Sequence, residues 1–327
     1  MLQNMKCVLG LFMLCLLACT ENKYAGIPEK YHALLDQALV KAGDNATELT
    51  AALKNAPDNQ KEGMAFLIAY MPERDLKELT ADFLLENTAY AYQAREKYVW
   101  AREIPDTVFL NDVLPYVSLN ETREGWRKEF YERFGKYVQH CKTIFEAIDS
   151  VNRNVRDEVL VDYNTKREKP DQSPFESMTD AFRAVGIPSR VAGTPNWHDE
   201  RGNHNWTEVW ADGNWYFTEF YFPGQLNNAW FFADAGKAVK NDQQKAIYAS
   251  SFKPTGTYFP LVWDENIRYV PAANVTDFYT DLYKSHLETI SADGNHVPLR
   301  IMMFTDNACV QNSEDRVAAN LDIFCGK

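Results

Sequence analysis

The strongest local signal in the chain is the dipeptide Asp212-Gly213, which stands between two short segments rich in aromatic and β-branched residues. These segments are Asn205–Trp210 and Asn214–Glu219. Asp-Gly favours the tight two-residue turn of antiparallel strands, because both of its positions must tolerate positive φ angles. We therefore expect a β-hairpin here, in which Trp210 is paired with Trp215.

The register of this hairpin has a chemical consequence. Counting back from the turn places Glu219 opposite Trp206 and diagonal to His204, on one face and within side-chain reach. A carboxylate that holds one imidazole nitrogen leaves the other nitrogen available as a general base. The alternative is a solvated glutamate beside a histidine that binds backbone groups. The hairpin alone leaves both interpretations open.

A helix and a strand are predicted directly before the hairpin. Ser173-Pro174-Phe175-Glu176 combines an N-cap serine, a proline at the first helical position and a glutamate three residues after the cap. This helix is expected to run through Ala184 and to stop at Gly186. The segment Ser189–Ala192 then predicts a strand.

The segments on either side of this core differ in their periodicity. Between Pro28 and Val151 the apolar residues recur at helical spacing, as in the run Asp75–Leu85, and Thr143 with Glu146 forms a capping box. From Asn274 onward the pattern favours β structure. The two clearest predicted strands there are Val297–Phe304 and Val317–Cys325.

Together these patterns predict an α+β protein, with a helix packed on an antiparallel sheet in its core. The last predicted strand ends two residues before the end of the sequence, which favours an incomplete or truncated module. The expected organisation is a signal peptide at 1–18, a linker at 19–27, a helical N-terminal region at 28–151, the core at 152–272 and a short C-terminal β module at 273–327.

Three motifs of the core occur in an order that resembles the transglutaminase-like proteins, which are papain-like thiol enzymes. The motifs are Arg183-Ala-Val-Gly-Ile-Pro-Ser-Arg190, His204-Asn-Trp-Thr-Glu-Val-Trp210 and Gly213-Asn-Trp-Tyr-Phe-Thr-Glu219. The resemblance covers about residues 171–232. Two segments of the helical region, Phe83–Asn87 and Phe109–Pro115, are similar to envelope lipoproteins of Bacteroides-type bacteria that carry this core.

The resemblance implies roles for particular residues. His204 corresponds to the catalytic base, and Glu219 stands where the family usually has the aspartate that orients it. Trp206 is expected to pack beside the imidazole. The loop before His204 borders the substrate cleft in relatives, so Trp197 and His198, together with Trp206, are the expected substrate-binding residues.

The nucleophile departs from the family pattern. The family places a cysteine at the start of the helix that ends at Arg183, where the helix dipole and the histidine lower the thiol pKa. The residues at that distance are Asp171, Gln172 and Ser173, and none is cysteine. Cys141 lies about thirty residues before these positions, which makes it a poor substitute. Ser173 is expected to use its hydroxyl as a helix cap, so a Ser-His-Glu hydrolase is the lesser alternative. The resemblance therefore implies an impaired or inactive member of a family of amide hydrolases and acyltransferases, a pseudoenzyme.

A second interpretation is a non-catalytic lipoprotein that binds peptides or glycans on the same fold. No metal and no cofactor is expected in either case. The segment Trp197–Glu200 with His204 lacks the fixed spacing of metal ligands, and Cys141, Cys309 and Cys325 form no ligand pattern. Cys309 and Cys325 lie on or next to two neighbouring predicted strands, where a disulfide and simple burial are both open.

The N-terminus predicts the cellular location. Lys6 precedes an apolar run, Val8–Leu17, that ends in Ala18-Cys19 and resembles a bacterial lipoprotein signal with Cys19 as the lipidated residue. An ordinary secretory signal and an uncleaved anchor are the alternatives. We therefore expect a lipid-anchored protein of the cell envelope, on the periplasmic side or at the surface of the outer membrane.

The net charge of the chain limits the classes of molecule that it is expected to bind. The formal net charge is −12, which argues against nucleic acid, because phosphate binding requires clustered Lys and Arg. The expected partners are a peptide, protein or glycan substrate in the envelope and the membrane that the lipid enters.

Overall fold

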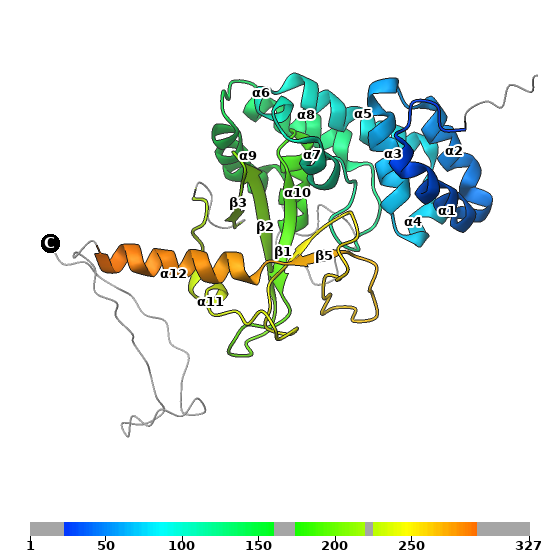
Figure 1. The fold of residues 1–327 in the computed structure, drawn as a ribbon. Coiled ribbons are helices and arrows are strands. Elements are labelled where there is room, and N and C mark those ends of the chain that lie inside the picture. Colours follow the sequence, from blue (N-terminus) through cyan, green and yellow to red (C-terminus); the bar gives the residue numbers. More distant parts are fainter. Residues whose placement is uncertain (1–22, 160–173, 220–224, 293–327) are drawn as a thin grey trace, which may run out of the picture.

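The computed structural model describes residues 23–159, 174–219 and 225–292 (Figure 1). The predicted signal peptide, Cys19, the stretch Asp171–Ser173 and the two predicted C-terminal strands lie outside the described residues. Within the described ranges, no helix has the length and apolar character needed to cross a membrane.

The N-terminal region is helical, as its periodicity predicted. Its elements are η1 (Glu29–Tyr31), α1 (His32–Ala42), η2 (Gly43–Asn45), α2 (Ala46–Asn55), η3 (Asp58–Gln60), α3 (Lys61–Tyr70), α4 (Glu73–Glu78), α5 (Ala81–Lys97), α6 (Val99–Arg102), α7 (Asp106–Asp112), α8 (Trp126–Val138) and α9 (Ile144–Val159). Helix α9 crosses the boundary expected after Val151, so the helical region and the core share this helix.

Two local predictions in this region had different outcomes. The Thr143 hydroxyl accepts a hydrogen bond from the Glu146 backbone N–H at 3.2 Å at the start of α9, which confirms the cap. The run Asp75–Leu85, expected as one helix, is broken at Leu79-Thr80 into α4 and α5. Leu79 is extended and the Thr80 side chain caps α5, because threonine at that position satisfies a first-turn N–H.

The core is a five-stranded antiparallel sheet with the strand order β3-β2-β1-β4-β5. Its strands are β1 (Ser189–Thr194), β2 (His204–Ala211), β3 (Asn214–Thr218), β4 (Tyr248–Ser250) and β5 (Ala272–Asn274). The β2–β3 hairpin turns at Asp212-Gly213, both with positive φ, and pairs Trp210 with Trp215, as predicted. This pairing fixes the register of the whole hairpin.

The two faces of the sheet are covered differently. On the first, the helix face, α10 (Pro174–Ala184) packs on β1 and β2, and Thr179 approaches Thr207 at 3.4 Å between their hydroxyl oxygens. On the second, the site face, α11 (Phe232–Ala235) and α12 (Thr276–Ala292) enclose an aromatic cluster. Its buried members are Ala192, Trp197, Trp206, Phe217, Phe231, Phe232, Ala235, Ile247, Ala249 and Tyr279.

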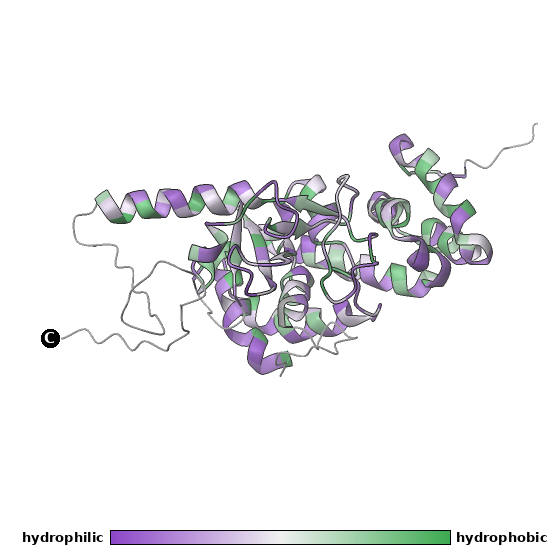
Figure 2. Ribbon diagram, turned by 90° about the horizontal axis from the view of Figure 1, so that it is seen from below, coloured by the Kyte–Doolittle hydropathy of each residue, from purple (hydrophilic) through white to green (hydrophobic). Residues whose placement is uncertain are grey.

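Helix α12 corrects the expectation of continuous β structure after Asn274. The Asn274 side chain accepts hydrogen bonds from the backbone N–H and the hydroxyl of Thr276, and this arrangement starts the helix. Tyr279 lies near the start of α12 and is fully buried. The next turns pack on α11, and the outer turns project from the body, on the side opposite the N-terminal helices. Polar and apolar residues alternate along the helix (Figures 1 and 2).

Candidate active site

His204 and Glu219 meet at the end of the hairpin far from its turn. His204 begins β2, and Glu219 directly follows β3 on the same face. Nε2 of His204 lies 2.9 Å from Oε2 of Glu219, and the carboxylate side chain is 5% exposed. The predicted contact is therefore present. Because an ionised carboxylate only accepts hydrogen bonds, the imidazole proton is assigned to Nε2, which leaves the lone pair on Nδ1.

The direction of α10 relates this pair to the start of a helix. Arg183, near the end of α10, donates through Nε to the carbonyl of Ser189 at the beginning of β1. Thr179, a turn earlier, approaches Thr207 in the middle of β2. Helix α10 thus runs antiparallel to β1, and its N-terminal end lies toward the end of the strands where His204 begins β2. The positive end of the helix dipole points toward the same end of the sheet.

Aromatic rings surround the His204 imidazole. The centroids of Trp206, Trp197 and Phe231 lie 5.8, 6.0 and 5.2 Å from its centroid. Trp206 packs beside the imidazole, as expected. Trp197 and Trp206 are 4% and 1% exposed, so the predicted contact of these two residues with substrate stays a prediction that their burial does not favour.

Trp230 is the exposed ring of the group. Its centroid lies 4.9 Å from that of His204, and 49% of the residue is exposed. Its exposure could not be predicted from the sequence, because a tryptophan in an aromatic run gives no sign of which ring remains at the surface. Trp230 and the partly exposed His204 side chain form the open part of the site.

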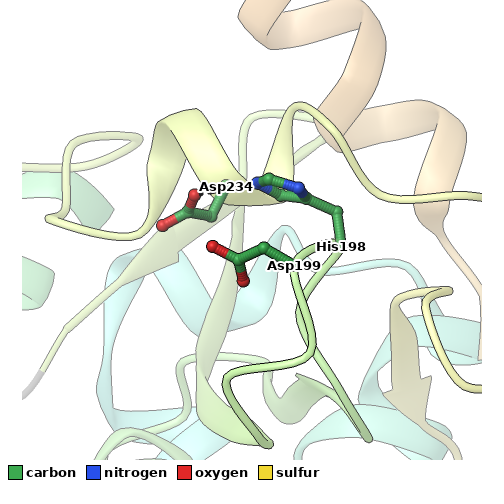
Figure 3. A group of neighbouring side chains, drawn as sticks. All are labelled: His198, Asp199 and Asp234. Carbon is green, nitrogen blue, oxygen red and sulfur yellow. Dashed lines mark hydrogen bonds and ion pairs between the residues drawn. The ribbon is translucent and has the colours of Figure 1, made fainter. Parts of the chain in front are cut away.

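Arg201 neutralises the acidic cluster next to the site. His198, Asp199 and Asp234 turn toward one another (Figure 3), and their ligand atoms lie within 4.8 Å. His198 Nε2 lies 3.2 Å from Asp234 Oδ1, so this predicted substrate contact is occupied by a neighbour. The Arg201 guanidinium binds Asp199 at 2.7 Å and Asp234 at 2.6 Å. A cation would have to displace this guanidinium, so the donor set does not favour a metal centre.

Cys141 lies apart from this group of residues. It follows α8 and packs against the large core of the helical region, with its sulfur 3.9 Å from the Tyr137 carbonyl oxygen. Burial raises the pKa of the Cys141 thiol, and the charge of Glu146 raises it further. A raised pKa disfavours the thiolate at neutral pH, which makes Cys141 a weak nucleophile.

The remaining site-face residues form a buried chain that the sequence analysis missed. It joins Arg190, Glu208, Tyr279 and Trp206 by hydrogen bonds. Glu208 had a sequence signal, because it lies two and four residues from Trp206 and His204 in one strand and therefore shares their face. Tyr279 comes from α12, and no local pattern connects it with the hairpin.

The comparisons with known proteins agree with this geometry. The family model of the transglutaminase-like superfamily matches residues 133–234, which run from α8 to α11. Neither the curated proteins nor the solved structures gave a match. Residues 133–234 therefore form a transglutaminase-like superfamily domain. The matched region contains His204 and Glu219 and starts earlier than the motifs, whereas α12 lies beyond it.

Proposed function

We propose that this protein derives from thiol amide hydrolases or acyltransferases, that His204 and Glu219 keep the roles of base and orienting acid, and that the nucleophilic thiol is missing. The observation that carries the proposal is the 2.9 Å contact between His204 Nε2 and the buried Glu219 carboxylate. With the proton on Nε2, Nδ1 of His204 is the free proton acceptor. It lies at the end of β2 that the start of α10 faces. A base in this place suits the activation of a group at the helix N-terminus.

The missing thiol decides how much chemistry remains. The sequence has no cysteine between Cys141 and Cys309. An amide bond is broken in such enzymes when a thiolate attacks the carbonyl carbon and the histidine returns a proton to the leaving amine. Without a thiolate, no thioester acyl-enzyme forms, and among the described residues no thiol lies where the base could activate it. We therefore expect negligible thiol-dependent amidase or acyltransferase activity.

The first test measures activity directly. The full chain is assayed for hydrolysis and transfer of peptide amides, with and without iodoacetamide. We expect no iodoacetamide-sensitive turnover. Turnover that iodoacetamide abolishes would contradict the proposal, and its loss in Cys141→Ala would identify Cys141 as the nucleophile.

The second test asks whether the site still activates a thiol. Asp171→Cys, Gln172→Cys and Ser173→Cys each introduce a thiol shortly before α10, in a Cys141→Ala background. If one of them lies beside His204, its alkylation by iodoacetamide at pH 7 should be about tenfold faster than that of Cys141 in the unaltered chain, because the imidazole and the helix dipole favour the thiolate. His204→Gln should abolish the increase. Alkylation no faster than that of Cys141 in all three variants would contradict the proposed site.

A second function, non-catalytic binding of a peptide or glycan, is favoured by Trp230. The residue is 49% exposed and its ring lies beside His204. An exposed tryptophan suits stacking against a sugar ring or an apolar side chain. Calorimetric titration with envelope-type peptides and glycans should show binding that Trp230→Ala weakens about tenfold. Titrations without heat for both ligand classes would contradict this function.

We also propose that the protein is a lipoprotein of the cell envelope. The support is the apolar run that ends in Ala18-Cys19 near the N-terminus. Cells fed a radiolabelled fatty acid should incorporate the label into the wild-type chain and not into Cys19→Ser. Equal labelling of both chains, or of neither, would contradict the lipid anchor.

A further inference from the structure

We infer that Tyr279 of α12 is a positioning residue for His204 and acts through the Trp206 indole. The inference rests on the proposed function, because it assigns a purpose to the orientation of the imidazole. It concerns a helix outside the matched transglutaminase-like region. The geometry consists of one buried hydrogen-bond chain and one ring stack.

The hydrogen-bond chain begins at an ion pair between neighbouring strands. Arg190 of β1 faces Glu208 of β2 in the sheet, and its Nε donates to Glu208 Oε2 at 2.6 Å. The Tyr279 hydroxyl donates to the other carboxylate oxygen at 2.5 Å. Trp206 Nε1 then donates to the Tyr279 hydroxyl oxygen at 2.7 Å. Glu208, Tyr279 and Trp206 are at most 1% exposed.

The donors and acceptors allow only one direction of hydrogen bonding along this chain. An indole N–H donates and never accepts, so the Tyr279 oxygen must be the acceptor of Trp206 and must send its own proton to Glu208. Burial raises the pKa of Tyr279 well above its ordinary value, and the Glu208 charge raises it further. The phenol thus stays protonated. Its removal leaves a buried indole N–H and one carboxylate oxygen without the partner seen here.

The Trp206 indole, held by this hydrogen-bond chain, stacks on the His204 imidazole. The planes of Trp206 and His204 are inclined by 29° with centroids 5.8 Å apart, and Phe231 stacks on Trp206 at 4.4 Å. The Tyr279 ring meets the indole edge to face at 5.4 Å, so the phenol holds the indole by ring contact as well as by hydrogen bond. Because the contact of Nε2 with Glu219 depends on the orientation of the imidazole plane, the indole that flanks this plane helps to set the contact.

The chain provides a matched control for this inference. Tyr283 lies one turn after Tyr279 on α12, and its ring packs on Phe232 at 5.3 Å. Tyr283→Phe and Tyr279→Phe are the same chemical change in the same helix. Only Tyr279→Phe removes a hydroxyl from the chain that ends at Trp206.

The experiment uses the full chain labelled with ¹⁵N-histidine and ¹⁵N-tryptophan, with His204→Gln and Trp206→Phe to assign resonances. In the wild type, the two ring nitrogens of His204 should show a single neutral tautomer with the proton on Nε2. In Tyr279→Phe the difference between these two resonances should shrink, and the Trp206 indole proton should exchange with solvent roughly two- to tenfold faster, the factor that one hydrogen bond is worth. Tyr283→Phe should retain the wild-type values.

Two results would overturn the inference. The first is an unchanged pair of His204 resonances in Tyr279→Phe. The second is an equal change at His32 and His140, which belong to the helical region and would report general loosening. Neither readout depends on a nucleophile, so failure here differs from failure of the introduced thiols to react, which would contradict the proposed function instead.

Discussion

Two groups of buried charged residues, one on each side of α10 and its sheet, use arginine in opposite ways. Between α10 and the helical region, Arg127 and Arg183 donate mainly to backbone carbonyls. On the site face, Arg190 donates to the Glu208 carboxylate and thereby starts the chain to Trp206. The first group supports irregular backbone, whereas the second orders side chains next to His204.

The contrast extends to the acids of the two groups. Asp180 lies beside the two arginines of the first group, and neither of its carboxyl oxygens has a hydrogen-bond partner among the described residues. Burial raises the pKa of Asp180 well above its ordinary value, the Glu121 charge adds to this, and the two arginines oppose it. Glu208, in contrast, receives bonds on both oxygens. Of these two buried acids, only Glu208 is held by hydrogen-bond donors and can therefore order its neighbours in the site.

The largest expected effect is the loss of Arg127 from the first group. Its guanidinium donates to Asn87 and to the carbonyls of Val113, Leu114 and Pro115, which lie outside helices and strands. Arg127→Met should lower the free energy of unfolding by about 4–5 kcal/mol, because buried carbonyls lose their donors. Arg153→Met, which breaks an exposed pair with Asp149, is the control and should change the free energy of unfolding far less. Urea denaturation compares them, and equal losses would contradict the structural role of the buried arginine.

The second prediction concerns the carboxylate of the site-face chain. Glu208→Gln should lower the free energy of unfolding by about 3 kcal/mol, since Arg190 loses a buried counter-charge. It should also disturb the Trp206 indole resonance, because Tyr279 loses its charged acceptor. Glu73→Gln, in an exposed pair with Lys77, is the control and should change the free energy of unfolding far less. An unchanged Trp206 indole resonance in Glu208→Gln would contradict this and show that the ion pair does not order the site.

The third prediction concerns Asp112, a buried acid that interacts electrostatically with one arginine from each group. Burial raises the pKa of Asp112 to about 6, and the charges of Arg190 and Arg183 oppose this rise. Between pH 4 and 6 the folded chain keeps a proton that the unfolded chain has lost. The free energy of unfolding should therefore fall as pH rises through this range, by at most about 3 kcal/mol.

Asp112→Asn removes this titration. The stability of the variant relative to the wild type should increase from pH 4 to pH 6 and then level off. Urea denaturation at intervals of one pH unit measures the difference. A constant difference over this range would contradict the buried, protonated state of Asp112.

The smallest expected effect on stability is at Trp230, at the open edge of the site face. Since about half of the residue is exposed, Trp230→Ala should cost only about 1 kcal/mol. Trp263→Ala, at another exposed tryptophan, is the control for thermal unfolding. A loss of several kcal/mol in Trp230→Ala would show that this ring belongs to the packed core and not to a binding surface.

The sequence predicted the features that depend on local periodicity and turn chemistry. The Asp212-Gly213 turn determines the hairpin register, and the register brings His204 to Glu219. The helix ending before Gly186 followed from its cap and stop signals. These inferences needed no knowledge of distant segments.

Features that depend on long-range packing escaped prediction. Trp206 and Tyr279 are 73 residues apart in sequence, and no spacing rule joins them. Helix α12 itself was missed, although Thr276, Tyr279 and Tyr283 recur at helical intervals. The exposure of Trp230 could not be predicted either, because it depends on which of the neighbouring rings the fold buries.

The placement of Tyr279 within α12 has a mechanical consequence. The helix has 17 residues and is therefore a stiff rod about 25 Å long. Its first turn is embedded against the sheet, and Tyr283 and His286 in the following turns pack on Phe232 of α11. The outer turns stand clear of the body (Figure 1). A force on the outer end tilts the rod about its embedded end, and the oxygen that accepts the indole proton sits near that pivot. We expect such a tilt to reach the imidazole through the hydrogen bond between Tyr279 and Trp206.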